Sequence, residues 1–97
     1  MNKMRAIHPG EILREEFMLP LNLSAHALAI ALRVAAPRIN DIVREKRGII
    51  PDTALRLARY LNTTPQFWLN LQVSYDLKIA QSVVGKTIER EVLPLAA

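Results

Sequence analysis

The chain has 97 residues, 51% of them hydrophobic, and a formal net charge of +4 with a pI near 10. This length supports one domain with one core, and the apolar content excludes a disordered chain. The absence of cysteine excludes disulfides and thiolate metal sites, and the basic charge favours a polyanionic partner. No stretch has the length of a membrane span or signal peptide, so we expect a cytoplasmic protein without a membrane partner.

Proline and small polar residues divide the chain into five expected helices joined by short turns. The first begins at His8–Glu11, because proline suits the first helical position and an acid suits the positive end of the helix dipole. Pro20 ends this helix. The second follows Ser24, whose hydroxyl can cap it, and runs to about Leu32.

The third expected helix begins near Ala36 and ends between Arg44 and Lys46, and the fourth and fifth begin at Pro51 and at Thr64–Pro65. No segment alternates apolar and polar residues as a strand does, so the fold class is all-α with five helices. After residue 81 the sequence signals for regular secondary structure weaken. Residues 1–81 therefore form the expected domain, and residues 82–97 a short C-terminal tail that is helical, a short strand, flexible or associated with a dimer.

Residues 25–44 carry the apolar spacing of a helix-turn-helix. Leu28, Ala29 and Leu32 occupy one face of the first helix of this motif, and Ile39 and Ile42 occupy one face of the second. Alanine at position 29 is informative, because a second helix that crosses steeply over the first leaves room there for only a methyl group. The spacing therefore predicts a helix-turn-helix DNA-binding domain.

Two positions depart from local preferences. Arg33 lies at the corner of the motif, where glycine is common because the backbone turns left-handed, and another residue costs about 1–2 kcal/mol. Ile50 precedes the fourth helix at a position where Ser or Thr would cap it, a loss of about 1 kcal/mol. A packed domain tolerates both, so neither argues against the fold.

The outward side of the second motif helix carries side chains suited to a DNA groove. Asn40 can bond adenine in a bidentate manner, and Arg38 or Arg44 can bond guanine, each pair giving about 1–3 kcal/mol of discrimination. Asp41 can accept from cytosine or orient Arg38 or Arg44. The alanines and the proline can touch a thymine methyl, and the cations after the helix suit phosphates. The predicted DNA-binding residues are His26, Ala35, Ala36, Pro37, Arg38, Asn40, Asp41, Arg44, Lys46 and Arg47.

The charge distribution agrees with this surface. Residues 33–59 contain seven basic and three acidic side chains and so account for the whole net charge. A solvated basic surface is the alternative for the charge taken alone, and an exposed polar residue is the alternative for each side chain taken alone. Their coincidence with the helix-turn-helix spacing favours DNA.

We expect no enzymatic activity, no cofactor and no metal site. His8 and His26 lack the spacing of metal ligands, and His8 suits a helix start better. The three glycines form no phosphate-binding loop, and capping accounts for Ser24.

A dimer is expected from the apolar residues of the last two helices. The stripe that contains Trp68, Leu71, Tyr75 and Ile79 is mostly core, yet these helices offer more apolar surface than three short helices can cover. An isologous dimer is the usual solution, and it would place two groove-binding helices one DNA turn apart on a palindrome.

Five sequence blocks resemble the HigA/VapI-type antitoxins of the phage-repressor-like (XRE) helix-turn-helix family. They are His8–Leu13, Arg38–Arg44, Thr53–Ala58, Pro65–Gln72 and Tyr75–Leu77, and the likeness covers about residues 7–80. The resemblance implies a dimer that represses its own operon at a palindromic operator. It also implies that the protein neutralises a HigB-type toxin, a RelE-like ribonuclease that cuts messenger RNA on the ribosome, and that toxin binding alters operator affinity.

The chain departs from the family at Glu45, where relatives commonly have glycine, so the loop that carries Lys46 and Arg47 is expected to bend differently. No toxin-binding residues can be transferred from the resemblance. Two alternatives stay open: a stand-alone helix-turn-helix regulator without a toxin, and a protein-interaction module whose basic face does not bind DNA.

Overall fold

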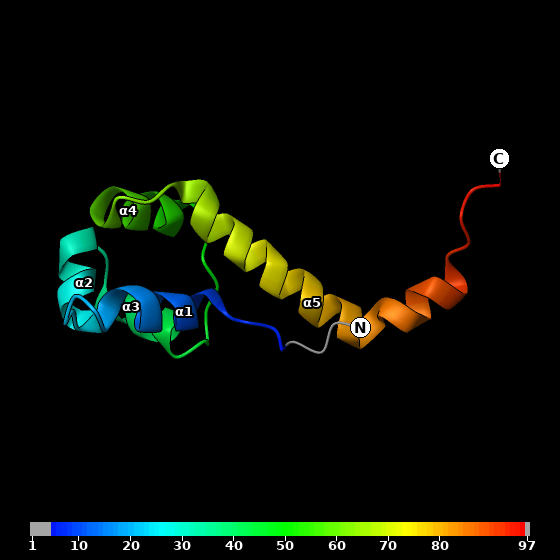
Figure 1. The fold of residues 1–97 in the computed structure, drawn as a ribbon, viewed down its shortest axis with the longest axis horizontal. Coiled ribbons are helices and arrows are strands. Elements are labelled where there is room, and N and C mark those ends of the chain that lie inside the picture. The colour runs from blue at the N-terminus through cyan, green and yellow to red at the C-terminus, as the bar shows by residue number, and fades with distance from the viewer. Residues whose placement is uncertain (1–4, 97) are drawn as a thin grey trace.

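Six helical segments arranged around one core make up this computed structural model, which describes residues 5–96 (Figure 1). They are α1 (Pro9–Ile12), a π-helical segment η1 (Leu13–Met18), α2 (Ala25–Leu32), α3 (Ala36–Val43), α4 (Pro51–Leu61) and α5 (Pro65–Glu91). The described residues contain no strand. Because η1 continues α1 without a break, the described residues form five helices, and the predicted all-α fold is confirmed.

The helix starts follow the capping residues of the sequence. Ser24 Oγ accepts a hydrogen bond from the Ala27 amide at 3.0 Å, and Thr64 Oγ1 accepts from the Phe67 amide at 3.1 Å. The Nδ1 atom of His8 accepts from the Gly10 amide at 2.9 Å, so His8, expected as a helix-start residue, also caps α1 through its side chain. Ile50 makes no side-chain cap, also as expected.

The core lies where the helices of the motif meet the flanking helices. Leu28, Ala29 and Ile39 are buried at the α2–α3 contact, which confirms the apolar pattern of the helix-turn-helix. Trp68 closes the core from the first turns of α5, fully buried, and its indole Nε1 donates to Thr63 Oγ1 at 2.7 Å. The packing of these residues fixes the position of α3.

The N-terminal segment packs against the end of α3. A side chain on Gly10 would overlap the carbonyl oxygen of Ile42, so α1 approaches α3 as closely as two backbones can. Arg14 donates from Nη1 to the carbonyl oxygen of Val43, which satisfies a backbone acceptor at the C-terminal end of α3. Residues 9–14 therefore hold the end of α3 in place.

The longest element, α5, continues as a helix beyond residue 81, where the sequence left several alternatives open. It has 27 residues and is about 40 Å long at 1.5 Å per residue. Figure 1 shows that it changes direction in its C-terminal part. Ser82 Oγ donates to the Ile79 carbonyl at 2.9 Å and Gly85 follows, and both features favour a bend.

Two parts of the molecule are named below. Residues 5–79 form the helical head, which contains the buried core. Residues 80–96 form the C-terminal extension, which projects away from the head (Figure 1).

Candidate nucleic-acid interface

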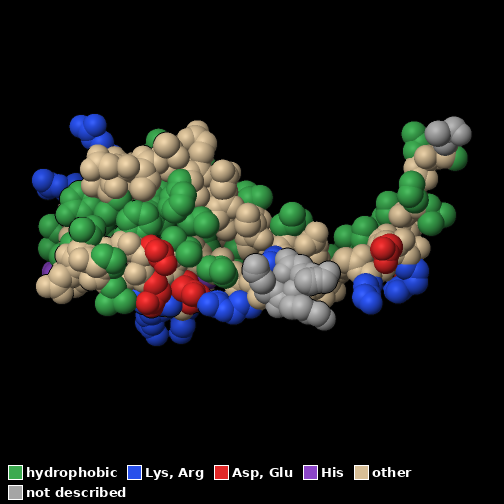
Figure 2. All heavy atoms as spheres, viewed as in Figure 1, with side chains coloured by type: hydrophobic (Ala, Val, Ile, Leu, Met, Phe, Trp, Pro, Cys, Tyr) green, Lys and Arg blue, Asp and Glu red, His purple; other side chains and the backbone are tan. Residues whose placement is uncertain are grey.

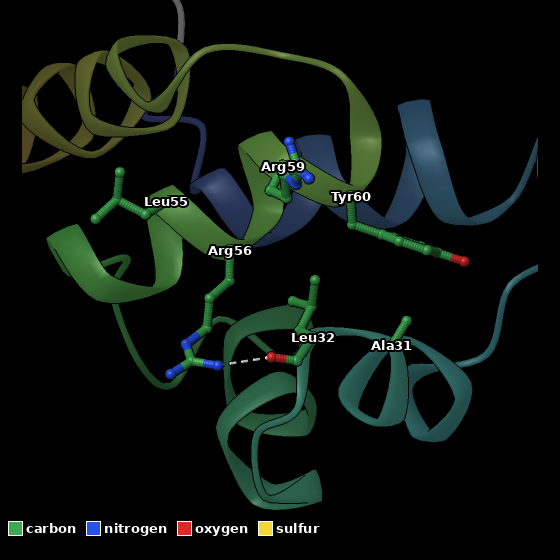
Figure 3. A pocket seen from close by; sticks show the side chains of 6 residues that line it. All are labelled: Ala31, Leu32, Leu55, Arg56, Arg59 and Tyr60. Atoms are coloured by element: carbon green, nitrogen blue, oxygen red, sulfur yellow. Dashed lines mark hydrogen bonds between the residues drawn. The ribbon is translucent and has the colours of Figure 1, made fainter.

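The corner between α2 and α3 turns left-handed at Arg33, which has φ 61° and ψ 43°. The amide of Val34 donates to the Ala29 carbonyl at 3.0 Å, and this bond closes the corner. From α4, Arg56 Nη1 donates to the Leu32 carbonyl at 2.9 Å (Figure 3). The left-handed conformation expected for this position is thus confirmed, and a side chain from another helix supports it.

None of the ten residues predicted to bind DNA is buried, so the structure leaves them all accessible to a ligand. Ala36, Arg38 and Asp41 are half-buried, and the methyl of Ala36 packs partly against the core. The remaining seven are exposed: His26, Ala35, Pro37, Asn40, Arg44, Lys46 and Arg47. Asn40 is exposed on α3 and Arg44 is exposed at its C-cap, and their contacts to DNA stay predictions.

A hydrogen-bonded network joins α3 to α4. Asp52 Oδ1 accepts from Arg38 Nη1 and from Arg56 Nε, each at 2.7 Å. Arg56 and then Arg38 hold the pKa of the Asp52 carboxyl below its usual value, because both donate to the ionised form. Sequence reasoning missed this network. The spacing of Asp52 and Arg56 at i,i+4 was a readable signal for a pair, but only the fold brings Arg38 to it.

The loop after α3 presents cations on a defined backbone. Glu45 has φ 63°, the left-handed conformation that a glycine there would favour, so the turn is made despite the side chain. Arg14 lies 3.5 Å from the Glu45 carboxylate. Asp41 pairs with Arg47 at 3.1 Å, and not with Arg38 or Arg44 as one of the sequence hypotheses had it. This pair links the loop to α3.

His8 is explained by its structural surroundings. It is buried, and its ring meets the ring of Tyr75 edge-on with centroids 4.8 Å apart. Burial lowers the pKa of the imidazole, while Glu45 and Asp76 oppose that shift. Its role as a helix-start residue, expected from the sequence, is confirmed by the bond to Gly10.

The head carries an open pocket between two helices and a surface of mixed charge. An open pocket of 470 Å³ lies between α2 and α4, lined by Ala31, Leu32, Leu55, Arg56, Arg59 and Tyr60 (Figure 3). Figure 2 shows acidic side chains beside basic ones on one side of the head, and hydrophobic side chains recurring along the extension.

Among the described residues, no group of three or more His, Asp or Glu side chains could hold a metal. No helix in the described part of the chain is long and apolar enough to cross a membrane.

Comparisons with known proteins give close relatives, although no family model matches the chain. The chain is 65% identical over 80 residues to virulence-associated protein I of Dichelobacter nodosus. This alignment covers 82% of this chain and 74% of the relative. It is 46% identical over 68 residues to an uncharacterised HTH-type transcriptional regulator of Haemophilus influenzae, covering 70% of this chain and 64% of that one.

Solved structures agree over nearly the whole length. The antitoxin HigA of Pseudomonas aeruginosa, solved with the higBA promoter, superposes with a TM-score of 0.93 at 56% identity, covering 95% of this chain and 100% of that one. The antitoxin GraA in complex with its operator superposes with a TM-score of 0.92 at 54% identity, covering 100% of this chain and 98% of that one.

Proposed function

This chain belongs to the HigA/VapI-type antitoxins of the phage-repressor-like helix-turn-helix family, and we propose that it binds operator DNA as a dimer and represses its own operon. We further propose that it neutralises a HigB-type, messenger-RNA-cleaving toxin by direct binding. The observation that carries the DNA-binding part is the likeness over almost the full chain to two antitoxins solved with promoter or operator DNA.

The exposed residues of the recognition helix α3 and of its C-cap support the DNA-binding part. Asn40 and Arg44 present an amide and a guanidinium to solvent, the groups that make bidentate bonds to adenine and guanine. Lys46 and Arg47 follow on the next loop, where cations can neutralise phosphates. A surface with both kinds of group can hold its register on a duplex and discriminate among sequences.

The C-terminal extension supports the dimer. Its large apolar side chains are exposed, with Val83 at 71%, Val84 at 40% and Ile88 at 50%. Val84 and Ile88 line an open groove that also includes Leu77. A projecting helix with this much apolar surface is normally covered by a partner, and the same helix of a second copy would be self-complementary. Two copies would then present two recognition helices to a palindrome.

Neutralisation of a toxin rests on family membership, because no described surface identifies the toxin contact. A stand-alone regulator is the second candidate, and the relative from Haemophilus influenzae that is described as a transcriptional regulator favours it. The two candidates share the DNA-binding surface and differ only in the second partner.

One gel-shift experiment separates the candidates. The purified protein is titrated onto the DNA upstream of its own gene, with and without the product of the adjacent gene. A sequence-specific shift that the product modulates supports an autorepressing antitoxin. A specific shift that is indifferent to the product favours the stand-alone regulator, and no shift at low salt contradicts DNA binding itself.

Two variants locate the interface in the same assay. Asn40→Ala is expected to lose the preference for the upstream sequence while the protein stays folded, because the amide carries sequence information. Lys46→Ala is the matched control. It should weaken binding to all sequences and reduce the slope of log affinity against log salt concentration by about one unit in magnitude. Full sequence preference in Asn40→Ala would remove Asn40 from the interface.

A further inference from the structure

Asp52 lies at the centre of a network that includes one residue of the proposed interface. Its Oδ1 atom receives hydrogen bonds from Arg38 on α3 and from Arg56 on α4. Arg56 also bonds the last carbonyl of α2, at Leu32. One carboxylate therefore couples the orientation of an arginine on the recognition helix to the corner of the helix-turn-helix.

We propose that Asp52 is a positioning residue for operator recognition, which holds the Arg38 guanidinium in the orientation that bonds a base edge. The inference rests on the DNA-binding function proposed above. The bond to Asp52 engages Nη1 of Arg38 and leaves the edge formed by Nε and Nη2 to donate in parallel. Two parallel donors match the O6 and N7 acceptors of guanine.

Preorganisation is the physical reason for such a contact. A free arginine side chain samples many rotamers, and binding a base in one of them costs conformational entropy. The bond to Asp52 restricts Arg38 before DNA arrives, and the bond from Arg56 restricts Asp52 in turn. Arg38 has only 30% of its side chain exposed, which agrees with a restricted guanidinium.

The charge of Asp52 makes the proposal distinguishable from simple stabilisation. Its side chain is 51% exposed, so its negative charge opposes the approach of phosphates. A carboxylate here lowers affinity for DNA of any sequence, while its bond to Arg38 favours the correct base. Removing the Asp52 carboxylate should therefore lower the preference for the specific sequence without lowering the affinity for non-specific DNA.

The test measures affinity of the full chain by fluorescence anisotropy for two duplexes of equal length. One carries the DNA upstream of its own gene, and the other carries the same bases scrambled. In Asp52→Ala, which removes both the charge and the acceptor of the Arg38 and Arg56 bonds, the affinity for scrambled DNA should stay equal or rise. The preference for the upstream DNA should fall about tenfold, within the range of one bidentate base contact. Glu16→Ala removes the same charge from an exposed position on η1 and should leave the preference unchanged.

A double-mutant cycle shows whether Asp52 acts through Arg38. In an Arg38→Ala background, Asp52→Ala should cause no further loss of preference. The proposal is overturned if Asp52→Ala keeps the wild-type preference, if it weakens both duplexes equally together with a lower melting temperature, or if the two losses are additive. Absence of any preference in the wild-type protein would instead contradict the proposed function.

Discussion

The helical head and the C-terminal extension reach stability by different routes. In the head, large apolar side chains such as Leu13, Ile39 and Trp68 are fully buried, and other helices cover them. In the extension, Val83, Val84 and Ile88 are 40–71% exposed although they belong to a continuous helix. The head can therefore fold around its own core, whereas the extension gains most of its stability by packing against a second surface.

The largest effects should follow from breaking the core of the head. Trp68→Ala removes the largest fully buried side chain and its bond to Thr63, so the free energy of unfolding should fall by about 3–5 kcal/mol. At protein concentrations low enough to keep the chain monomeric, Ile88→Ala on the extension should change the free energy of unfolding by only about 0.5 kcal/mol, because the side chain is half exposed there. Denaturant unfolding measures both.

The variant on the extension should have the clearer effect when dimer association is measured. Sedimentation equilibrium should show a weaker dimer for Ile88→Ala, since its side chain lines the groove of the extension. If Ile88→Ala were as destabilising as Trp68→Ala and left association unchanged, the extension would belong to the core of the head.

The two helical glycines give a second, smaller contrast. In Gly10→Ala the added methyl overlaps the Ile42 carbonyl, so α1 must move away from α3, at a cost of about 1–3 kcal/mol. In Gly85→Ala the nearest neighbour is the Cβ of Gln81 at 3.9 Å, and the better helix propensity should stabilise the helix by up to about 1 kcal/mol. Opposite shifts in melting temperature are expected, and a loss in both would mean that a partner packs against Gly85.

Helix starts and the buried face of the helix-turn-helix were predictable because they depend on local signals. Ser24 and Thr64 cap through bonds to amides three residues away, and Ala29 is informative through its size alone. The left-handed corner at Arg33 also followed from its place in the motif. Such features need only the residue and its near neighbours.

The contacts that orient the recognition helix were not predictable, because they join residues far apart in the chain. Arg14 lies 29 positions from its acceptor on Val43, and Arg38 lies 14 positions from Asp52. Their proximity depends on how helices pack, which periodicity does not specify. The π-helical geometry of η1 was missed for a similar reason, since the apolar spacing of Leu13 and Phe17 suits an ordinary helix as well.

Local sequence signals also did not predict that α5 continues as a helix beyond residue 81. Ser82, Val83 and Gly85 have modest helix propensity, and this weakened the signal beyond residue 81. Starting a helix is costly, whereas extending one adds a hydrogen bond for each residue ordered. A segment that would not form a helix alone can therefore continue one that Thr64 and Trp68 have already anchored in the head.

The free energy of unfolding of the head should depend on pH, because His8 is a buried histidine of the head. Burial holds its folded-state pKa below the usual value near 6.5, so the neutral ring is favoured in the folded protein. Above that pH both states are neutral and the stability is complete. As the pH falls below it, the unfolded chain binds a proton first, and the free energy of unfolding decreases until the folded-state pKa is passed.

Protonation also explains why this loss should act through the start of α1. A proton on Nδ1 would remove the acceptor of the Gly10 amide, and a charged ring would lie against Tyr75 in a buried site. His8→Asn keeps a capping acceptor without titrating, so its stability should depend less on pH between about 5 and 7 than that of the wild type. Denaturant unfolding across this range measures the difference. Equal slopes in both proteins would assign the pH dependence to other groups and leave His8 with capping and packing alone.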